Sequence, residues 1–197
     1  MARPQEIITL PARGWRIDRR KALVVSALCW AGFLLLVWLV TTGRTGSLDQ
    51  LGLLFWRTGA GLAPKGPNWL LEGVRDLTSL GGVLLRNLIV IGAVVALLFL
   101  KMRREAMLLA LTVMGAWAVD AAIKGLVGRP RPEIVPHLTE AGGASFPSGH
   151  AFNSAVVYIA IALAFATLSA RESVRLTVIG TAIALSLVVA WTRVWLG

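Results

Sequence analysis

The sequence predicts an all-α protein, a polytopic bundle of transmembrane helices. Hydrophobic residues make up 56% of the 197 residues and charged residues only 15%, with a mean hydropathy of +0.73. A soluble domain carries about 25% charged residues, so this chain has too little polar surface for a water-soluble globule. Several uncharged runs approach the roughly 20 residues that a helix needs to cross the hydrocarbon core. We expect one membrane domain over residues 22–197, preceded by a basic cytoplasmic tail over residues 1–21.

Five transmembrane spans are predicted from the apolar runs. They cover about residues 22–40, 81–100, 105–126, 150–169 and 175–196. A signal peptide is the alternative for the first run, but the run is long for one and the following TTGRTGS has no cleavage-site pattern. Glycines recur within the spans and suit close helix packing in lipid: Gly32, Gly92, Gly115 and Gly180.

Residues 41–79 are mixed and contain no run long enough to span. LGLLFW is short, GAGLAPKGPNW is broken by Gly and Pro, and LLEGVRDLTSL has the spacing of an amphipathic helix. We expect surface-lying or re-entrant segments, with Trp56 and Trp69 at the level of the lipid headgroups. An ordinary extramembrane loop remains the alternative.

The net charge of +10 does not indicate a nucleic-acid partner, because the basic residues flank the spans and form no continuous basic face. The short connections KMRRE and ARESVR are basic, which places them in the cytoplasm with the N-terminal tail. Residues 41–79, the segment from Lys124 to His150 and Gly197 then lie on the outer side. Cys29, the one cysteine, excludes a disulfide within the chain.

Two charged residues lie inside predicted spans. Arg86 is near the outer end of its span, where its side chain can extend to the headgroups, so we interpret it as structural. Asp120 is four residues before Lys124 and shares its helix face. Pairing for solvation and tuning of the lysine are equally good interpretations of Asp120.

The long polar segment between Lys124 and His150 has the densest functional signals. Arg131 stands between two prolines, which stiffen its backbone for binding a phosphate. Ser148 is a natural N-cap, Gly149 permits close approach of a ligand, and the helix N-terminus favours an oxyanion. His150 can exchange a proton near neutral pH. These groups together are suited to metal-free phosphoryl transfer.

At these residues the sequence resembles the type 2 phosphatidic acid phosphatase superfamily, membrane lipid phosphatases related to vanadium haloperoxidases. Its first motif, Lys, six residues, then Arg-Pro, matches Lys124 to Arg131-Pro132, and its second, Pro-Ser-Gly-His, matches residues 147–150. Its third motif begins with Ser-Arg, and the chain has Thr192-Arg193. The resemblance covers about residues 70–197 and implies five spans of an expected six.

The resemblance implies a role for each site residue. Lys124, Arg131 and Arg193 would bind the phosphate with Ser148 and the Gly149 backbone, and His150 would protonate the leaving group. The family's nucleophilic histidine would fall two residues beyond Gly197, so the domain is expected to be incomplete at its C-terminus and the chain as given inactive. His137 is the only other histidine, and we interpret it as a surface or lid residue.

The sequence thus predicts an enzyme that hydrolyses a lipid phosphomonoester or diphosphate on the extracytoplasmic face of a bacterial-type inner membrane, through a phosphohistidine. Phosphatidic acid, phosphatidylglycerol phosphate and undecaprenyl diphosphate are the substrates that the resemblance implies. A lipid phosphotransferase and a non-catalytic phospholipid-binding or transport protein are the alternatives. No metal or other cofactor is implied, because no residue cluster has ligand spacing. The expected partners are the lipid substrate and the bilayer, and the sequence does not indicate an oligomeric state.

Overall fold

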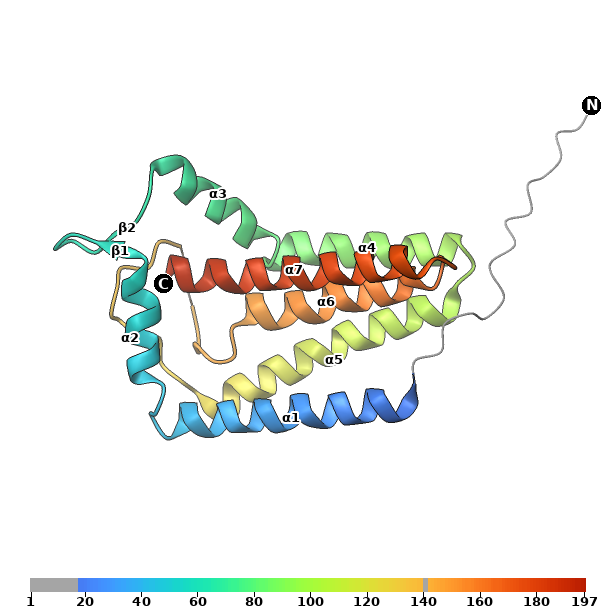
Figure 1. Cartoon of the computed structure of the whole chain (residues 1–197), viewed down its shortest axis with the longest axis horizontal. Coiled ribbons are helices and arrows are strands. Elements are labelled where there is room, and N and C mark those ends of the chain that lie inside the picture. The colour runs from blue at the N-terminus through green and yellow to red at the C-terminus, as the bar shows by residue number, and fades with distance from the viewer. Residues whose placement is uncertain (1–17, 140–141) are drawn as a thin grey trace, which may run out of the picture.

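Helices dominate the part of the chain that the computed structural model describes, residues 18–139 and 142–197. The helices and strands are α1 (Arg19–Thr41), α2 (Gly46–Phe55), β1 (Arg57–Thr58), β2 (Ala63–Pro64), α3 (Asn68–Ser79), α4 (Val83–Phe99), α5 (Arg103–Val127), α6 (Gly149–Ala166) and α7 (Glu172–Leu196). Five of the helices, α1 and α4–α7, run lengthwise through the molecule (Figure 1). The predicted tail falls almost wholly outside the described residues.

The predicted all-α transmembrane fold is confirmed. Helices α1, α5, α6 and α7 are each long and apolar enough to cross a membrane. Helix α4 has 17 residues and meets the same criteria only together with α3, from which it is separated by a bend of 47°. The helix predicted over 150–169 ends at Ala166, and a turn leads from there into α7.

The core lies between α4, α5, α6 and α7, and small side chains let these helices approach closely. Its buried residues include Ala93, Ala106, Ala162 and Ala182, with larger side chains such as Leu97 between them. The glycines expected to pack helices do not do so, since a β-carbon on Gly32, Gly92, Gly115 or Gly180 would meet no atom within 4 Å. Alanine fills the packing role at less conformational cost.

Helix α1 lies at the edge of the bundle beside α5 (Figure 1). It has no buried residue, and large apolar side chains such as Leu28 and Leu34 are exposed along it. Asp18 caps its N-terminus by accepting a hydrogen bond from the backbone N–H of Arg20 at 2.9 Å. Phe33 stacks on Phe146 at 6.2 Å between ring centroids, which connects α1 to the loop before α6.

The segment between α1 and α4 folds across one end of the bundle. Helix α2 runs across the direction of the long helices, and the β1–β2 hairpin and α3 follow at the same end (Figure 1). Trp69 is 70% exposed. Trp56 is half-buried and packs against Trp191 of α7, at 5.5 Å between ring centroids, because the end of α2 lies against α7.

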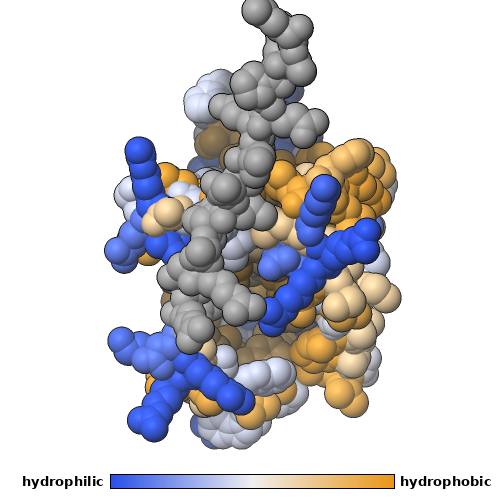
Figure 2. Space-filling model, turned by 90° about the vertical axis from the view of Figure 1, so that its right-hand side faces the viewer, coloured by the Kyte–Doolittle hydropathy of each residue, from blue (hydrophilic) through white to orange (hydrophobic). Residues whose placement is uncertain are grey.

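The opposite end of the bundle has a hydrophilic rim around apolar helix sides (Figure 2). The start of α1 and the α4–α5 and α6–α7 connections meet at this end (Figure 1). The basic residues of these three segments are Arg19, Arg20, Lys21, Lys101, Arg103, Arg104, Arg171 and Arg175.

Candidate active site

A cavity of about 760 Å³ opens at the end of the bundle that α2 crosses. Its walls come from α2, from α4–α7 and from the loop between α5 and α6. All six residues selected from the sequence line this one cavity: Lys124, Arg131, Ser148, Gly149, His150 and Arg193. Residues separated by as many as 69 positions in the chain are thereby brought to one place.

The loop between α5 and α6 is fixed at its base. Gly128 takes a left-handed conformation with φ of 56° and donates its N–H to the Lys124 carbonyl at 2.9 Å, which ends α5. Ser145 then donates its backbone N–H to the Arg129 carbonyl at 2.9 Å and its hydroxyl to the Pro130 carbonyl at 2.8 Å. These bonds hold the two ends of the loop together, so the first and second motifs face each other.

Ser148 is the N-cap of α6, as predicted. Its backbone is extended, and its Oγ accepts a long hydrogen bond of 3.5 Å from the Ala151 N–H. The first turn of an 18-residue helix therefore presents its free N–H groups and its positive dipole end to the cavity. This arrangement suits a phosphate oxygen.

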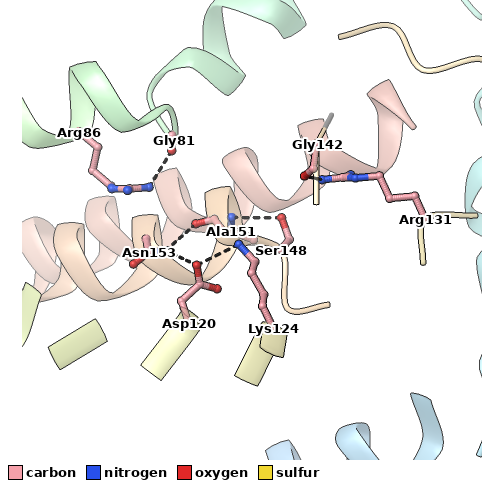
Figure 3. A network of polar contacts seen from close by, with 10 residues as sticks. Gly81, Arg86, Asp120, Lys124, Arg131, Gly142, Ser148, Ala151 and Asn153 are labelled. Carbon is pink, nitrogen blue, oxygen red and sulfur yellow. Dashed lines mark hydrogen bonds and ion pairs between the residues drawn. The ribbon is translucent and has the colours of Figure 1, made fainter. Parts of the chain in front are cut away.

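A polar network lies beneath this helix end (Figure 3). The Lys124 ammonium donates to Asp120 Oδ2 at 3.0 Å, and Asn153 Nδ2 donates to the same oxygen at 3.1 Å. Asn153 also donates to the Gly149 carbonyl at 3.0 Å. The carboxylate of Asp120 thus fixes the position of Lys124 against the first turn of α6.

Arg131 and Arg193 make hydrogen bonds only with neutral oxygens among the described residues. Arg131 Nη2 donates to the Gly142 carbonyl at 3.1 Å (Figure 3). Arg193 Nη1 lies 3.5 Å from Thr78 Oγ1 and 3.4 Å from Thr139 Oγ1. Both guanidinium groups are therefore available to neutralise an anion in the cavity.

His150 occupies the first turn of α6 and is half-buried. Gly81, at the break between α3 and α4, packs against it so closely that a β-carbon at position 81 would lie 3.2 Å from the His150 Cβ. The same β-carbon would lie 2.7 Å from Val189 Cγ1. Only glycine fits at position 81. The turn between α3 and α4 therefore packs directly against His150 and forms part of the cavity lining.

Residues 105–197, which comprise most of α5, the loop, α6 and α7, match the sequence profile of the PAP2 superfamily. The matched region contains both complete motifs and the Thr192-Arg193 pair. This region of the chain is therefore similar to the PAP2 superfamily. The resemblance predicted from the two motifs is confirmed.

The fold is similar to that of a solved structure, described as the first transmembrane PAP2 type phosphatidylglycerolphosphate phosphatase from Bacillus subtilis. The identity is 24%, the alignment covers 85% of this chain and 81% of that chain, and the TM-score is 0.73. A comparison with curated proteins gave no match. The match to the PAP2 profile and the shared fold support a membrane lipid phosphatase.

Two residues of this cavity were not predicted from the sequence, and the role of a third was left open. Arg86 does not extend to the headgroups but is buried at 4% exposure and lines the cavity. Asn153 was not selected, although a polar residue one turn after Gly149 was the available signal. Asp120 is the shared acceptor of Lys124 and Asn153.

The structure also places His137 and Thr192, the two remaining residues considered from the sequence. His137 is exposed, as expected, and lies at the rim of the cavity. The Thr192 hydroxyl donates to the Val189 carbonyl within α7 at 2.6 Å and does not line the cavity. Among residues 18–139 and 142–197, no three His, Cys, Asp or Glu side chains lie together in a way that could hold a metal ion.

Proposed function

We propose that the protein hydrolyses a phosphomonoester or diphosphate at the head of a membrane lipid, on the extracytoplasmic face of the membrane. The observation that supports this most is the shared cavity. Three cations from separate segments, Lys124, Arg131 and Arg193, line it together with the N-terminus of α6. This is the arrangement that phosphoryl transfer requires, since catalysis there depends on positioning and charge stabilisation.

In this proposal the cations bind the nonbridging phosphate oxygens. The Ser148 hydroxyl and the Gly149 N–H add hydrogen bonds at the end of α6. His150, in the same turn, donates a proton to the leaving oxygen, which belongs to the lipid alcohol of a phosphomonoester or to the lipid monophosphate of a diphosphate.

The nucleophile in this proposal is the histidine of the family's third motif. It attacks phosphorus as the bond to the leaving oxygen breaks, and water then attacks the phosphohistidine and releases inorganic phosphate. By the resemblance this histidine would follow Gly197. Since the proposed phosphate-binding residues all line the described cavity, we propose that residues 1–197 bind phosphate or vanadate.

A lipid substrate is supported by an apolar groove beside the cavity. The groove has a volume of about 370 Å³ and is lined by Cys29, Trp30, Phe33, Thr112, Ala116, Val119, Ile123, Phe152 and Val156, from α1, α5 and α6. One end of the groove is next to the site, since Ile123 precedes Lys124 and Phe152 lies two residues after His150. A lipid with its phosphate in the cavity could lay a hydrocarbon chain along this groove.

The charge distribution supports the proposed sidedness. The cavity lies at the end of the bundle away from the basic connections (Figures 1 and 2). Because cytoplasmic loops are enriched in Lys and Arg, the basic end faces the cytoplasm. The N-terminus then lies on the cytoplasmic side, and the site faces outward from an inner membrane of bacterial type.

The test uses the protein extended past Gly197 through the third motif, in detergent–lipid micelles. Phosphate release is measured from phosphatidic acid, phosphatidylglycerol phosphate and undecaprenyl diphosphate. We expect release from at least one of these lipids, and a loss of about 100-fold or more in Lys124→Ala and His150→Ala.

His137→Ala serves as the matched histidine control and is expected to retain its activity. Equal phosphate release by the wild type, Lys124→Ala and His150→Ala would overturn the proposal. Recovery of the phosphoryl group on an added alcohol would identify a phosphotransferase instead.

A further inference from the structure

Arg86 is a charged residue in an otherwise apolar helix. It lies one turn into α4, whose sequence VLLRNLIVIGAVVALLF has no other charge. Its exposure is 4%, so the guanidinium neither contacts lipid headgroups nor projects into solvent. Because a charge within a transmembrane segment is costly, such residues face a partner or a cavity.

The structure provides no acidic partner for Arg86 among the described residues. Its Nη1 donates to the Gly81 carbonyl at 2.9 Å (Figure 3), and its Nε is buried without a hydrogen-bond acceptor. Ion pairs in the described part of the chain join Lys124 to Asp120 and Arg129 to Asp49. A buried guanidinium with one neutral acceptor is incompletely compensated.

The charges around the cavity fall into two groups. Lys124 and Arg129 each have a carboxylate partner. Arg86, Arg131 and Arg193 have only carbonyl or hydroxyl acceptors within the described residues. Arg86 therefore resembles the two motif arginines in having no ion pair among the described residues, whereas the motif lysine is paired with Asp120.

The position of Arg86 complements that of Arg131. The two side chains lie on opposite sides of the Asp120–Lys124 network (Figure 3). Arg86 lines the cavity together with Gly81 and Val83 at the start of α4. An anion between the two would have guanidinium groups on both sides.

We propose that Arg86 is a further phosphate-binding residue, which contacts the bound anion from the α4 side of the cavity. This inference rests on the proposed function, because it takes the cavity to be the phosphate site. The free Nε–H of Arg86 donates to a phosphate oxygen while Nη1 keeps its bond to Gly81.

The experiment measures vanadate and inorganic phosphate binding by the purified 197-residue chain, from the rise in unfolding temperature with anion concentration. The variants are Arg86→Gln and Arg86→Lys, with Arg131→Gln as the motif reference. Arg57→Gln is the matched control, because Arg57 is also buried, at 5% exposure, and donates to a backbone carbonyl, but does not line the cavity.

We expect Arg86→Gln to weaken vanadate binding about tenfold or more, comparably to Arg131→Gln, because a charge-assisted hydrogen bond is lost. Arg57→Gln should lower the unfolding temperature without anion and leave vanadate affinity unchanged. Arg86→Lys should bind with an intermediate affinity, since it keeps the charge but not the planar donor set. If Arg86→Gln does not fold, Arg86→Lys decides by the same measurement.

This inference would be overturned if the folded Arg86 variants bind vanadate within twofold of the wild-type affinity while Arg131→Gln binds it clearly more weakly. That result would leave the proposed phosphate site intact. Unchanged affinity in Arg131→Gln as well, or no vanadate binding by the wild type, would overturn the proposed function itself.

Discussion

The ammonium of Lys124 lies 2.6 Å from the point that a β-carbon on Gly149 would occupy. The same β-carbon would be 3.3 Å from Asp120 Oδ2. The glycine of the second motif therefore leaves room for the lysine of the first, and this contact joins the motifs directly. The explanation for this glycine is a close approach between side chain and backbone, since its backbone is helical.

Gly149→Ala should weaken phosphate binding without loss of stability. The added methyl group displaces the Lys124 ammonium, while alanine favours the helix by about 0.5–1 kcal/mol. We expect vanadate affinity to fall about tenfold, the equivalent of one charge-assisted hydrogen bond. Binding is measured by titration, and the control is Gly115→Ala on α5, where a β-carbon meets no atom within 4 Å. If Gly149→Ala binds vanadate as tightly as the wild type, the contact between Gly149 and Lys124 does not position the ammonium for the anion.

Asn153→Ala should destabilise the protein. Asn153 is 4% exposed and donates to both Asp120 and the Gly149 carbonyl, so its loss removes one donor from each of these acceptors. We expect a cost of about 1–3 kcal/mol in the free energy of unfolding, measured by denaturant titration in mixed micelles. Ser154→Ala is the control, because that hydroxyl is fully buried without a partner. Equal stability of the two variants would show that the network contributes nothing.

Val119→Trp should discriminate between substrates by chain length. Val119 lines the apolar groove, and an indole there fills the space proposed for a hydrocarbon chain. In the protein extended past Gly197, KM for a long-chain lipid phosphate should rise several-fold, while kcat/KM for a dihexanoyl analogue stays unchanged. Leu111→Trp, at an exposed position of α5 outside the groove, should leave both unchanged. The same effect in both variants would exclude the groove as a chain site.

Sidedness can be measured by labelling single cysteines. In a Cys29→Ser background, Thr58→Cys reports on the end near the cavity and Ser173→Cys on the basic end, and both positions are exposed. A membrane-impermeant maleimide applied to intact cells should label Thr58→Cys alone, and both after lysis. Labelling of Ser173→Cys in intact cells would reverse the proposed topology.

The sequence predicted the helices well where composition alone decides them. The uncharged run at 22–40 became α1, and the Gly-Pro break after Val127 became the loop of the site. The pattern also separated the two helices of residues 68–99, since LLEGVRDLTSL lies largely in α3 and the predicted span over 81–100 contains α4. It did not predict the bend of 47° between them at Gly81 and Gly82. That bend reflects packing against His150 and Val189, a tertiary contact without a local signature.

The residues of the candidate site also differ in how well the sequence predicts them. Lys124, Arg131 and His150 stand in polar sequence with recognisable spacing, and the structure brings them to one cavity. Arg86 and Asn153 lie inside apolar runs, where sequence alone does not distinguish a side chain facing lipid from one facing a cavity. Their positions depend on how the helices rotate against one another, which side-chain packing determines.

Ser145 forms hydrogen bonds with the carbonyl groups of residues 129 and 130 at the base of the α5–α6 loop. These bonds hold the ends of the loop near the motifs. The middle of the loop is anchored separately, since Leu138 donates its N–H to the Leu196 carbonyl at 3.0 Å and its carbonyl accepts from Arg75 at 2.8 Å. Substitutions at the exposed Glu133 and Pro136 can therefore change what a lipid headgroup meets at the mouth of the cavity while both motifs keep their positions.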